Sequence, residues 1–234
     1  MRVVVVASLR RCVVREHGDT APWLHNVPLV QRRQEDFTET KTDLEFVCDI
    51  SKQERLAMTL QRDVVQPAQL IFKGDGIFPN SVLPLLFYRQ AITTNDKDLA
   101  SIIEKRFAEN DWTNSWRDGV YPFAHYHSTS HEVLGVYSGS ANLRLGGDHG
   151  KTVEVHAGDV IVIPAGVAHQ NISSSGHFGV VGAYPGGRSW DLLRGLPGER
   201  PGADRDIAAV PLPKNDPIFG SDGPLLRIWN ANTL

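Results

Sequence analysis

The chain has 234 residues, of which 41% are hydrophobic and 22% charged, and its formal net charge is −3. This balance is ordinary for a globular protein and lacks the excess of Lys and Arg with which proteins bind phosphates, so we expect no nucleic-acid partner. No apolar run approaches the ~20 residues that span a bilayer, so we expect no membrane partner. Cys12 and Cys48 indicate neither a disulfide framework nor a cysteine metal site, and a cytoplasmic location is the default expectation.

The first 67 residues differ in character from the rest. They mix charges of both signs with scattered apolar residues, and no helical or strand period persists. We interpret 1–67 as an irregular N-terminal extension that could be partly disordered, and we place the folded domain at 68–234.

Two strands and one helix are predicted at the start of this domain. The stretches 69–76 and 83–92 are apolar and bounded by Gly, Pro and Asn, which favours strands. The stretch 93–112 predicts a helix, because apolar residues recur in it at helical spacing, at Leu99, Ile102, Ile103 and Phe107. A side-chain cap is available at Asn95, Asp96 or Asp98, and Asn110 can end the helix.

Beyond Trp112 the pattern changes to short strands with Gly and Pro turns between them. These are predicted at 121–127, 131–138, 141–147, 151–158, 159–164, 169–173 and 177–184. Closely spaced strands without alternating helices indicate an all-β sandwich or barrel, with its core at about 119–184. Residues 185–224 predict an irregular wrap, and 225–230 could return as a last edge strand.

A group of histidines accompanies the strand predicted at 121–127. Alternate residues of a strand face the same side, so His125 and His127 share a face, and Tyr121 and Phe123 lie on it as well. Two neutral imidazoles that converge from one strand are suited to binding a metal.

Two further positions could complete such a site. His131 and Glu132 begin the next strand and face opposite ways, and because the intervening turn resets the phase, alternation does not choose between them. His169 follows the bend at Pro164 and Gly166, which is a position that can point into a barrel mouth.

Two segments resemble the paired signature of the cupin superfamily. The first motif, G-x5-H-x-H-x(3,4)-E-x6-G, is matched in every interval by Gly119, His125, His127, Glu132 and Gly139. The second, G-x5-P-x-G-x2-H-x3-N, is matched by Gly158, Pro164, Gly166 and His169. Its last position is Ser173 here, and Asn171, on the same strand face, could substitute.

Longer stretches are similar to the YjlB-like cupins, a largely uncharacterised single-cupin family, at 110–119, 125–147, 158–171, 182–187 and 216–226. The resemblance implies a cupin (RmlC-like) jelly-roll β-barrel preceded by one helix. It implies that the metal ligands are His125, His127, Glu132 and His169, with His131 turned outward. Candidate pocket-lining residues are Tyr121, Phe123, Asn171 and Tyr184, of which the first two could instead simply fill the barrel.

Three His and one Glu suit one divalent transition metal (Fe, Mn, Ni, Co, Cu or Zn) and leave about two octahedral positions open. We therefore expect a metal-dependent enzyme acting on a small-molecule ligand, with a dioxygenase-like oxidoreductase favoured over an isomerase or lyase. The alternative is a non-catalytic cupin that binds or senses a small molecule or a metal. We also expect a homodimer, because cupins often pair through edge strands and exposed sheet edges need covering. The sequence identifies no catalytic residue beyond these ligands.

Overall fold

The computed structural model describes residues 65–232. The chain divides into two units, Met1–Arg62 and Asp63–Leu234, and the described residues belong to the second. The extension predicted at 1–67 therefore lies almost entirely outside the described residues. Within the described part, no helix is long and apolar enough to cross a membrane.

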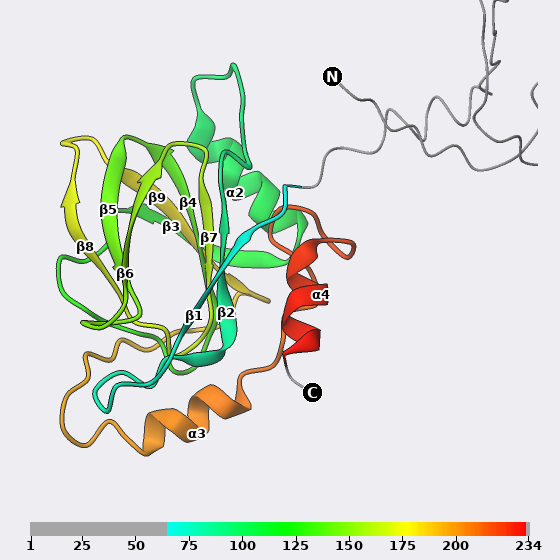
Figure 1. Ribbon diagram of the computed structural model, residues 1–234. Helices are drawn as coiled ribbons and strands as arrows, with labels where there is room; N and C mark the ends of the chain where they lie inside the picture. The colour runs from blue at the N-terminus through cyan, green and yellow to red at the C-terminus, as the bar shows by residue number, and fades with distance from the viewer. Residues whose placement is uncertain (1–64, 233–234) are drawn as a thin grey trace, which may run out of the picture. The chain divides into compact units, whose positions relative to one another are not determined.

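Two antiparallel sheets face each other and form the barrel (Figure 1). The larger has the strand order β1-β2-β7-β4-β9-β3 and the smaller the order β6-β5-β8. The strands are β1 Ala68–Phe72, β2 Ser81–Tyr88, β3 Trp112–Asp118, β4 Glu132–Ser138, β5 Ser140–Leu145, β6 Lys151–His156, β7 Val160–Ile163, β8 His169–Ser174 and β9 Gly179–Pro185. The predicted all-β jelly-roll fold is confirmed.

The central strands of the larger sheet are buried on both faces. In β4, Leu134 and Val136 pack between the two sheets with Leu143 of β5, whereas Val133 joins a second cluster on the outer face. Strands covered on both sides are apolar throughout instead of alternating, which is why β7 reads Val-Ile-Val-Ile. The even-numbered residues of β4 therefore point into the barrel and the odd-numbered residues point away from it, beginning with its first residue.

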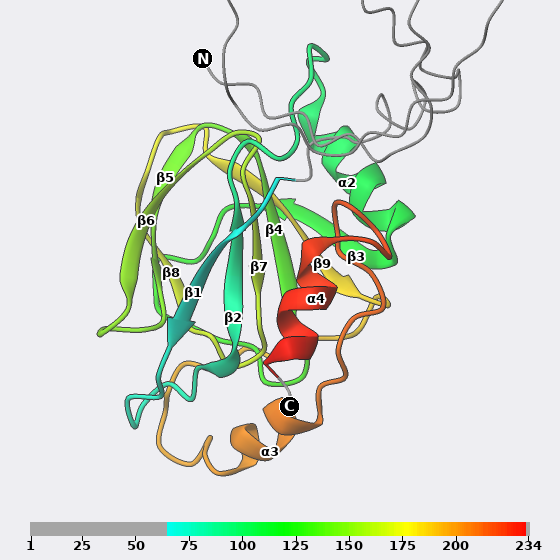
Figure 2. The same ribbon diagram turned by 45° about the vertical axis from the view of Figure 1, so that its right-hand side comes forward.

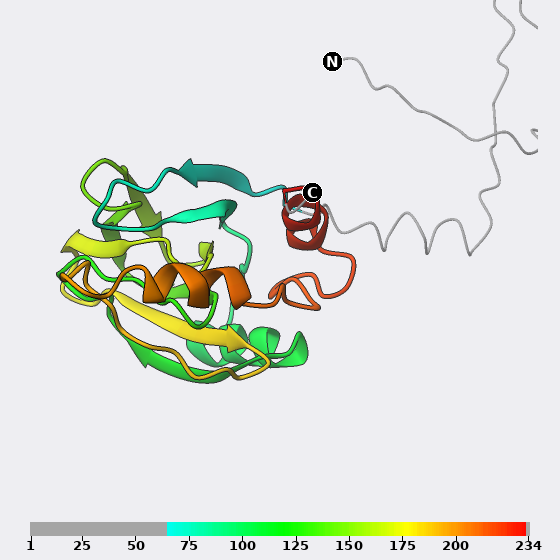
Figure 3. The same ribbon diagram turned by 90° about the horizontal axis from the view of Figure 1, so that it is seen from below.

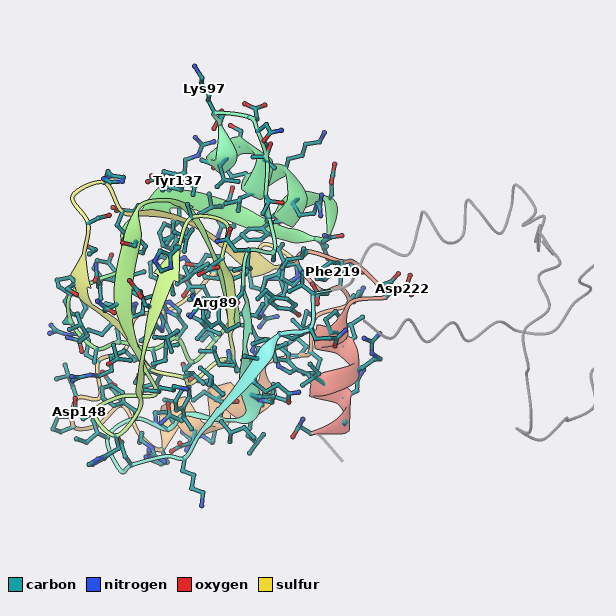
Figure 4. The ribbon with its side chains drawn as sticks, turned by 45° about the horizontal axis from the view of Figure 1, so that its top comes forward. Arg89, Lys97, Tyr137, Asp148, Phe219 and Asp222 are labelled. Atoms are coloured by element: carbon teal, nitrogen blue, oxygen red, sulfur yellow. The ribbon has the colours of Figure 1, made fainter. Side chains whose placement is uncertain are left out.

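Helices cover the outer face of the larger sheet (Figure 2). Helix α2, Leu99–Glu109, follows the turn that carries Lys97 (Figure 4), and its N-cap is Asp98, whose side chain accepts a hydrogen bond from the Ser101 N–H. The predicted helix and its cap are confirmed. Gly135 of β4 allows the close approach of α2, because a Cβ atom there would lie 2.6 Å from the Ile103 Cγ2.

The expectation of an edge strand at 225–230 is wrong. This segment lies in helix α4, Pro224–Ala231, which follows the loop that contains Phe219 and Asp222 (Figure 4). Proline is well suited to the first turn of a helix, and Leu225 and Trp229, four residues apart, are both fully buried on its inner side.

The expectation of a regular strand at 121–127 is also wrong. Only isolated bridges form there, between His125 and His169 and between Tyr126 and Leu193. Pro122 has no N–H with which to extend a ladder. Instead, β3 at Trp112–Asp118, which the sequence did not indicate as a strand, pairs with β9.

Helix α3, Gly202–Ala209, lies inside the predicted irregular wrap and crosses one end of the barrel (Figure 3). Ala203 of this helix packs in a small buried cluster with Phe78, Tyr126 and Ala168. Tyr126 thus points out of the barrel into this cluster, which anchors the backbone between His125 and His127.

Candidate metal centre

Three histidines converge inside the barrel. His125, His127 and His169 are buried, and each offers one ring nitrogen such that these atoms lie within 4.8 Å of one another. Two backbone hydrogen bonds join the segments, from His125 N to His169 O at 3.2 Å and from His169 N to His125 O at 2.9 Å. This pairing places the two rings 4.0 Å apart between centroids.

A backbone carbonyl holds the Nδ1 atom of each ring. His125 Nδ1 lies 3.1 Å from the Phe123 carbonyl, His169 Nδ1 lies 3.2 Å from the Val167 carbonyl, and His127 Nδ1 contacts the Asp191 carbonyl. A carbonyl only accepts, so each Nδ1 carries the proton and donates it. The three Nε2 atoms of the neutral rings are then left with free lone pairs, as metal-binding histidines require.

Glu132, the first residue of β4, brings a carboxylate to the same place. Its Oε2 lies 3.2 Å from His169 Nε2 and 3.5 Å from His127 Nε2. Its Oε1 accepts a hydrogen bond of 3.0 Å from the Tyr184 hydroxyl, which in turn accepts one of 2.8 Å from Trp116 Nε1. Gly182 makes room for this arrangement, because a Cβ atom there would lie 2.2 Å from the Trp116 ring.

The Glu132 Oε2 atom is the clearest sign that a cation fits here. It is buried and has no hydrogen-bond partner. A buried carboxylate oxygen that faces imidazole lone pairs and receives no donor is costly unless a positive charge lies between them. The donors present, three nitrogens and one oxygen, are a set that divalent transition metals accept.

The electrostatics of the cluster favour positive charge beside Glu132. Burial is the largest influence on the pKa of His127 and lowers it, but the attraction and hydrogen bond of Glu132, together with the carbonyl and charge of Asp191, outweigh burial, and the net shift is upward. Burial acts to raise the pKa of Glu132, yet its attraction to His127 and its contacts with His127 and His169 hold that pKa well below its usual range. Burial, with repulsion from His169, lowers the pKa of His125 to about 3.

His131 lies on the other side of β4, away from the cluster, as predicted. Its Nδ1 accepts a hydrogen bond of 3.0 Å from the Ala165 N–H, and its ring lies 4.7 Å from that of Trp229 in α4. It is only 2% exposed, so the residue that faces outward from the barrel is still buried beneath a helix.

A cavity of about 220 Å³ adjoins the histidines. Of the four candidate pocket residues, Tyr121 and Tyr184 line it, and Phe123 and Asn171 do not. Phe123 stacks on Tyr121 with 4.9 Å between ring centroids, and the Asn171 N–H donates to the Tyr121 carbonyl at 2.9 Å. Both non-lining residues therefore support Tyr121 from outside the cavity.

The strap, residues 186–199 between β9 and α3, contributes two residues that the sequence did not single out as site residues. The Trp190 ring lies 5.1 Å from that of His127 and lines the cavity. The Asp191 carbonyl contacts His127 Nδ1, and its carboxylate accepts hydrogen bonds from the N–H and hydroxyl groups of Ser128 and Thr129. A backbone carbonyl imposes no residue type, so the sequence carries no signal for this contact.

Comparisons with known proteins agree with this architecture. A cupin domain matches residues 118–177, which include all four candidate ligands. The chain is 45% identical over 159 residues to "Uncharacterized protein YjlB" of Bacillus subtilis (strain 168), a match that covers 68% of this chain and 93% of that protein.

Solved structures match the chain at lower sequence identity. The coconut allergen cocosin is 20% identical, with a TM-score of 0.27, over 33% of this chain and 22% of that chain, so this chain spans about a fifth of it. A DUF861 family protein from Thermotoga maritima is 19% identical, with a TM-score of 0.26, over 43% of this chain and 96% of that chain. The cupin match and the long YjlB alignment decide the assignment: the chain belongs to the cupin superfamily and, within it, to the YjlB-like family.

Proposed function

We propose that this protein is a metal-dependent enzyme that acts on a small molecule, with dioxygenase-like oxidoreductase chemistry favoured. One observation carries the proposal. Backbone carbonyls fix the tautomer of three histidine rings, so that their unprotonated Nε2 atoms face a buried carboxylate oxygen that has no hydrogen-bond donor. An open cavity adjoins this cluster. The proposed ligands are His125, His127, His169 and Glu132.

The donor set fits one divalent ion from Fe, Mn, Ni, Co, Cu and Zn. The Tyr184 hydroxyl donates to Glu132 Oε1, so Oε2 is the oxygen that this carboxylate would offer to an ion. Four protein ligands leave about two positions of an octahedral ion for other groups. An ion held there would supply Lewis-acid polarisation or redox chemistry to a small molecule in the cavity.

The residues around the ligands restrict the access of water and hold the protons of the site in place. Leu134 and the aromatic side chains of the cavity wall limit the access of water, which strengthens electrostatic interactions inside. Burial, together with the charge of Glu132, raises the pKa of Tyr184 far above its usual range, so its hydroxyl stays protonated and donates to the carboxylate. This mainly apolar wall favours a small organic substrate and an oxygen-using reaction over a polyanionic substrate.

Metal analysis of protein purified without a histidine tag tests the ligand set. We expect His127→Ala and Glu132→Ala each to lower metal content strongly, whereas His131→Gln, which changes the residue facing away from the cluster, should keep it. His156→Ala removes an exposed histidine and controls for non-specific surface binding. Full metal content in His127→Ala protein that is still folded would sink the assignment.

Oxygen-uptake assays with metal-replete protein and candidate small aromatics and thiols test the chemistry. Consumption of oxygen that depends on both metal and substrate supports the oxygenase. Metal-replete protein that consumes no oxygen and transforms no substrate would instead favour the binding or sensing alternative.

A further inference from the structure

Aromatic rings flank the histidine pair at the cavity. Tyr121 lies 5.2 Å from His125 and Trp190 lies 5.1 Å from His127, measured between ring centroids. Both rings line the cavity, and yet Tyr121 is 47% and Trp190 39% exposed. Large aromatic side chains left open beside a buried polar site are typical of a surface that receives a ligand.

Each open ring is held in place from behind. Phe123 stacks on Tyr121 at an interplanar angle of 17°, and the Arg194 guanidinium lies 4.3 Å from the centre of the Phe123 ring. Trp190 stacks on Tyr184 at 5.8 Å and 25°. Rings that are already ordered lose little conformational entropy when a ligand packs on them, so they form a ready platform for another flat ring.

The charges of the cavity wall disfavour carboxylate and phosphate ligands. Among the described residues that line it, the one Arg or Lys is Arg117, and its guanidinium is bound to Glu104 by hydrogen bonds of 2.8 and 2.6 Å and to Ser101 by one of 2.9 Å. Asp118 and Glu132 add carboxylates to the same wall. A ligand with several negative charges would therefore meet no uncommitted side-chain cation.

The size of the cavity limits the ligand to about one ring. Its volume of about 220 Å³ falls below the ~300–1,000 Å³ of sites for drug-sized molecules. We propose that the substrate is a single-ring aromatic that bears a phenolic oxygen, with its ring packed on Tyr121 and Trp190 and its oxygen toward the histidines. This inference rests on the proposed function, because the oxygen would take an open position on the ion.

Binding of 4-nitrocatechol to metal-replete protein, followed by the shift of its absorbance, tests the proposal. We expect saturable binding that phenol competes with and that oxalate, a small dianion without a ring, does not reverse at the same concentration. Trp190→Leu and Tyr121→Leu should each weaken binding roughly three- to tenfold, the range expected for one lost aromatic contact. Trp190→Phe should recover part of the loss.

Leu192→Ala is the matched control, since Leu192 is an exposed residue of the same strap that does not line the cavity. Displacement by oxalate in preference to phenol, or wild-type binding by Trp190→Leu, would overturn the inference while the metal site stands. If the protein holds no metal, the proposed function fails. Quenching of tryptophan fluorescence by phenol then tests separately whether the cavity binds a single aromatic ring. Weaker binding by Tyr121→Leu, which keeps every tryptophan that reports binding, then supports the aromatic platform, and no binding by the wild-type protein refutes it.

Discussion

The Tyr184 hydroxyl joins two buried polar groups, and its removal tests how the carboxylate ligand is oriented. It donates to Glu132 Oε1 at 3.0 Å and accepts from Trp116 Nε1 at 2.8 Å. Tyr184→Phe deletes one oxygen atom and keeps the ring in a fully buried position. Both neighbours then lose a partner, and Glu132 is left with neither oxygen hydrogen-bonded.

Two magnitudes follow. A hydrogen bond to a charged group contributes about 1.5–3 kcal/mol and a neutral one about 1 kcal/mol, so the free energy of unfolding of metal-free protein should fall by roughly 2.5–4 kcal/mol. Loss of a residue that orients a metal ligand weakens metal binding about 10- to 100-fold, equivalent to ~1.4–2.7 kcal/mol. The carboxylate keeps its charge and position on β4, so binding should weaken and not disappear.

Urea unfolding of the metal-free protein measures the first quantity, and titration against a chelating indicator measures the second. Tyr137→Phe is a matched control, because Tyr137 is a partly buried tyrosine that does not line the cavity. If Tyr184→Phe binds metal as tightly as wild type while folding normally, Tyr184 does not orient Glu132 and the reasoning fails.

Three further predictions concern stability and assembly. The buried Asp216 carboxylate accepts hydrogen bonds from the Tyr88 hydroxyl and from the N–H groups of Ile218, Phe219 and Leu225. Asp216→Ala should therefore lower the free energy of unfolding, measured by urea titration, by more than ~3 kcal/mol, and Asp216→Asn should lower it by less. Equal losses in the two variants would contradict this. Burial acts to raise the pKa of Glu199, but hydrogen bonds from the Arg194 and Gly195 N–H groups and the Tyr126 hydroxyl hold it lower. Because the folded-state pKa of Glu199 lies below the ordinary 4.5, the ionised carboxylate stabilises the fold above that pH, and this stabilisation is lost as the pH falls. Glu199→Gln should therefore flatten the acid side of a plot of melting temperature against pH, and an unchanged plot would refute this. The homodimer remains a prediction. Val82 is 78% exposed and lies in β2, next to the edge strand β1, so Val82→Lys should shift a dimer toward monomer in sedimentation experiments if two copies pair through that edge. A dimer that is unchanged by the substitution would place the interface elsewhere.

Local patterns predicted the helix and most of the strands well. Leu99, Ile103 and Phe107 face the sheet at helical spacing, and the cap at Asp98 lies where an Asx residue was expected. β7 was recognisable as a short apolar run between turn residues. These features depend on neighbouring residues, which is why the sequence alone was sufficient.

The failures arose where distant segments decide the structure. At 121–127 the alternation of His and aromatic residues resembles a strand, but the pairing partners available are single residues of β8 and the strap. At 225–230 the helix is supported by Asp216, whose carboxylate accepts from the Leu225 N–H. Neither partner can be read from the residues of the segment itself.

The candidate site shows the same division. Motif spacing placed His125, His127, His169 and Glu132 together; in the structure the three histidines converge, and the Glu132 carboxylate lies beside His127 and His169. The strap contributions of Trp190 and Asp191 were not predicted, since they depend on how residues after β9 fold back over the barrel mouth.

The carbonyl of Asp191 has a practical consequence for mutational scans. Every side-chain substitution at that position leaves a carbonyl in the chain, so a scan can disturb the loop at Ser128 and Thr129 and still never delete the acceptor that holds His127. Insertion or deletion of a residue in the strap would move that acceptor without changing either of the two cupin motifs. A change in the length of this segment can therefore displace the acceptor of His127, which no amino-acid exchange at position 191 removes.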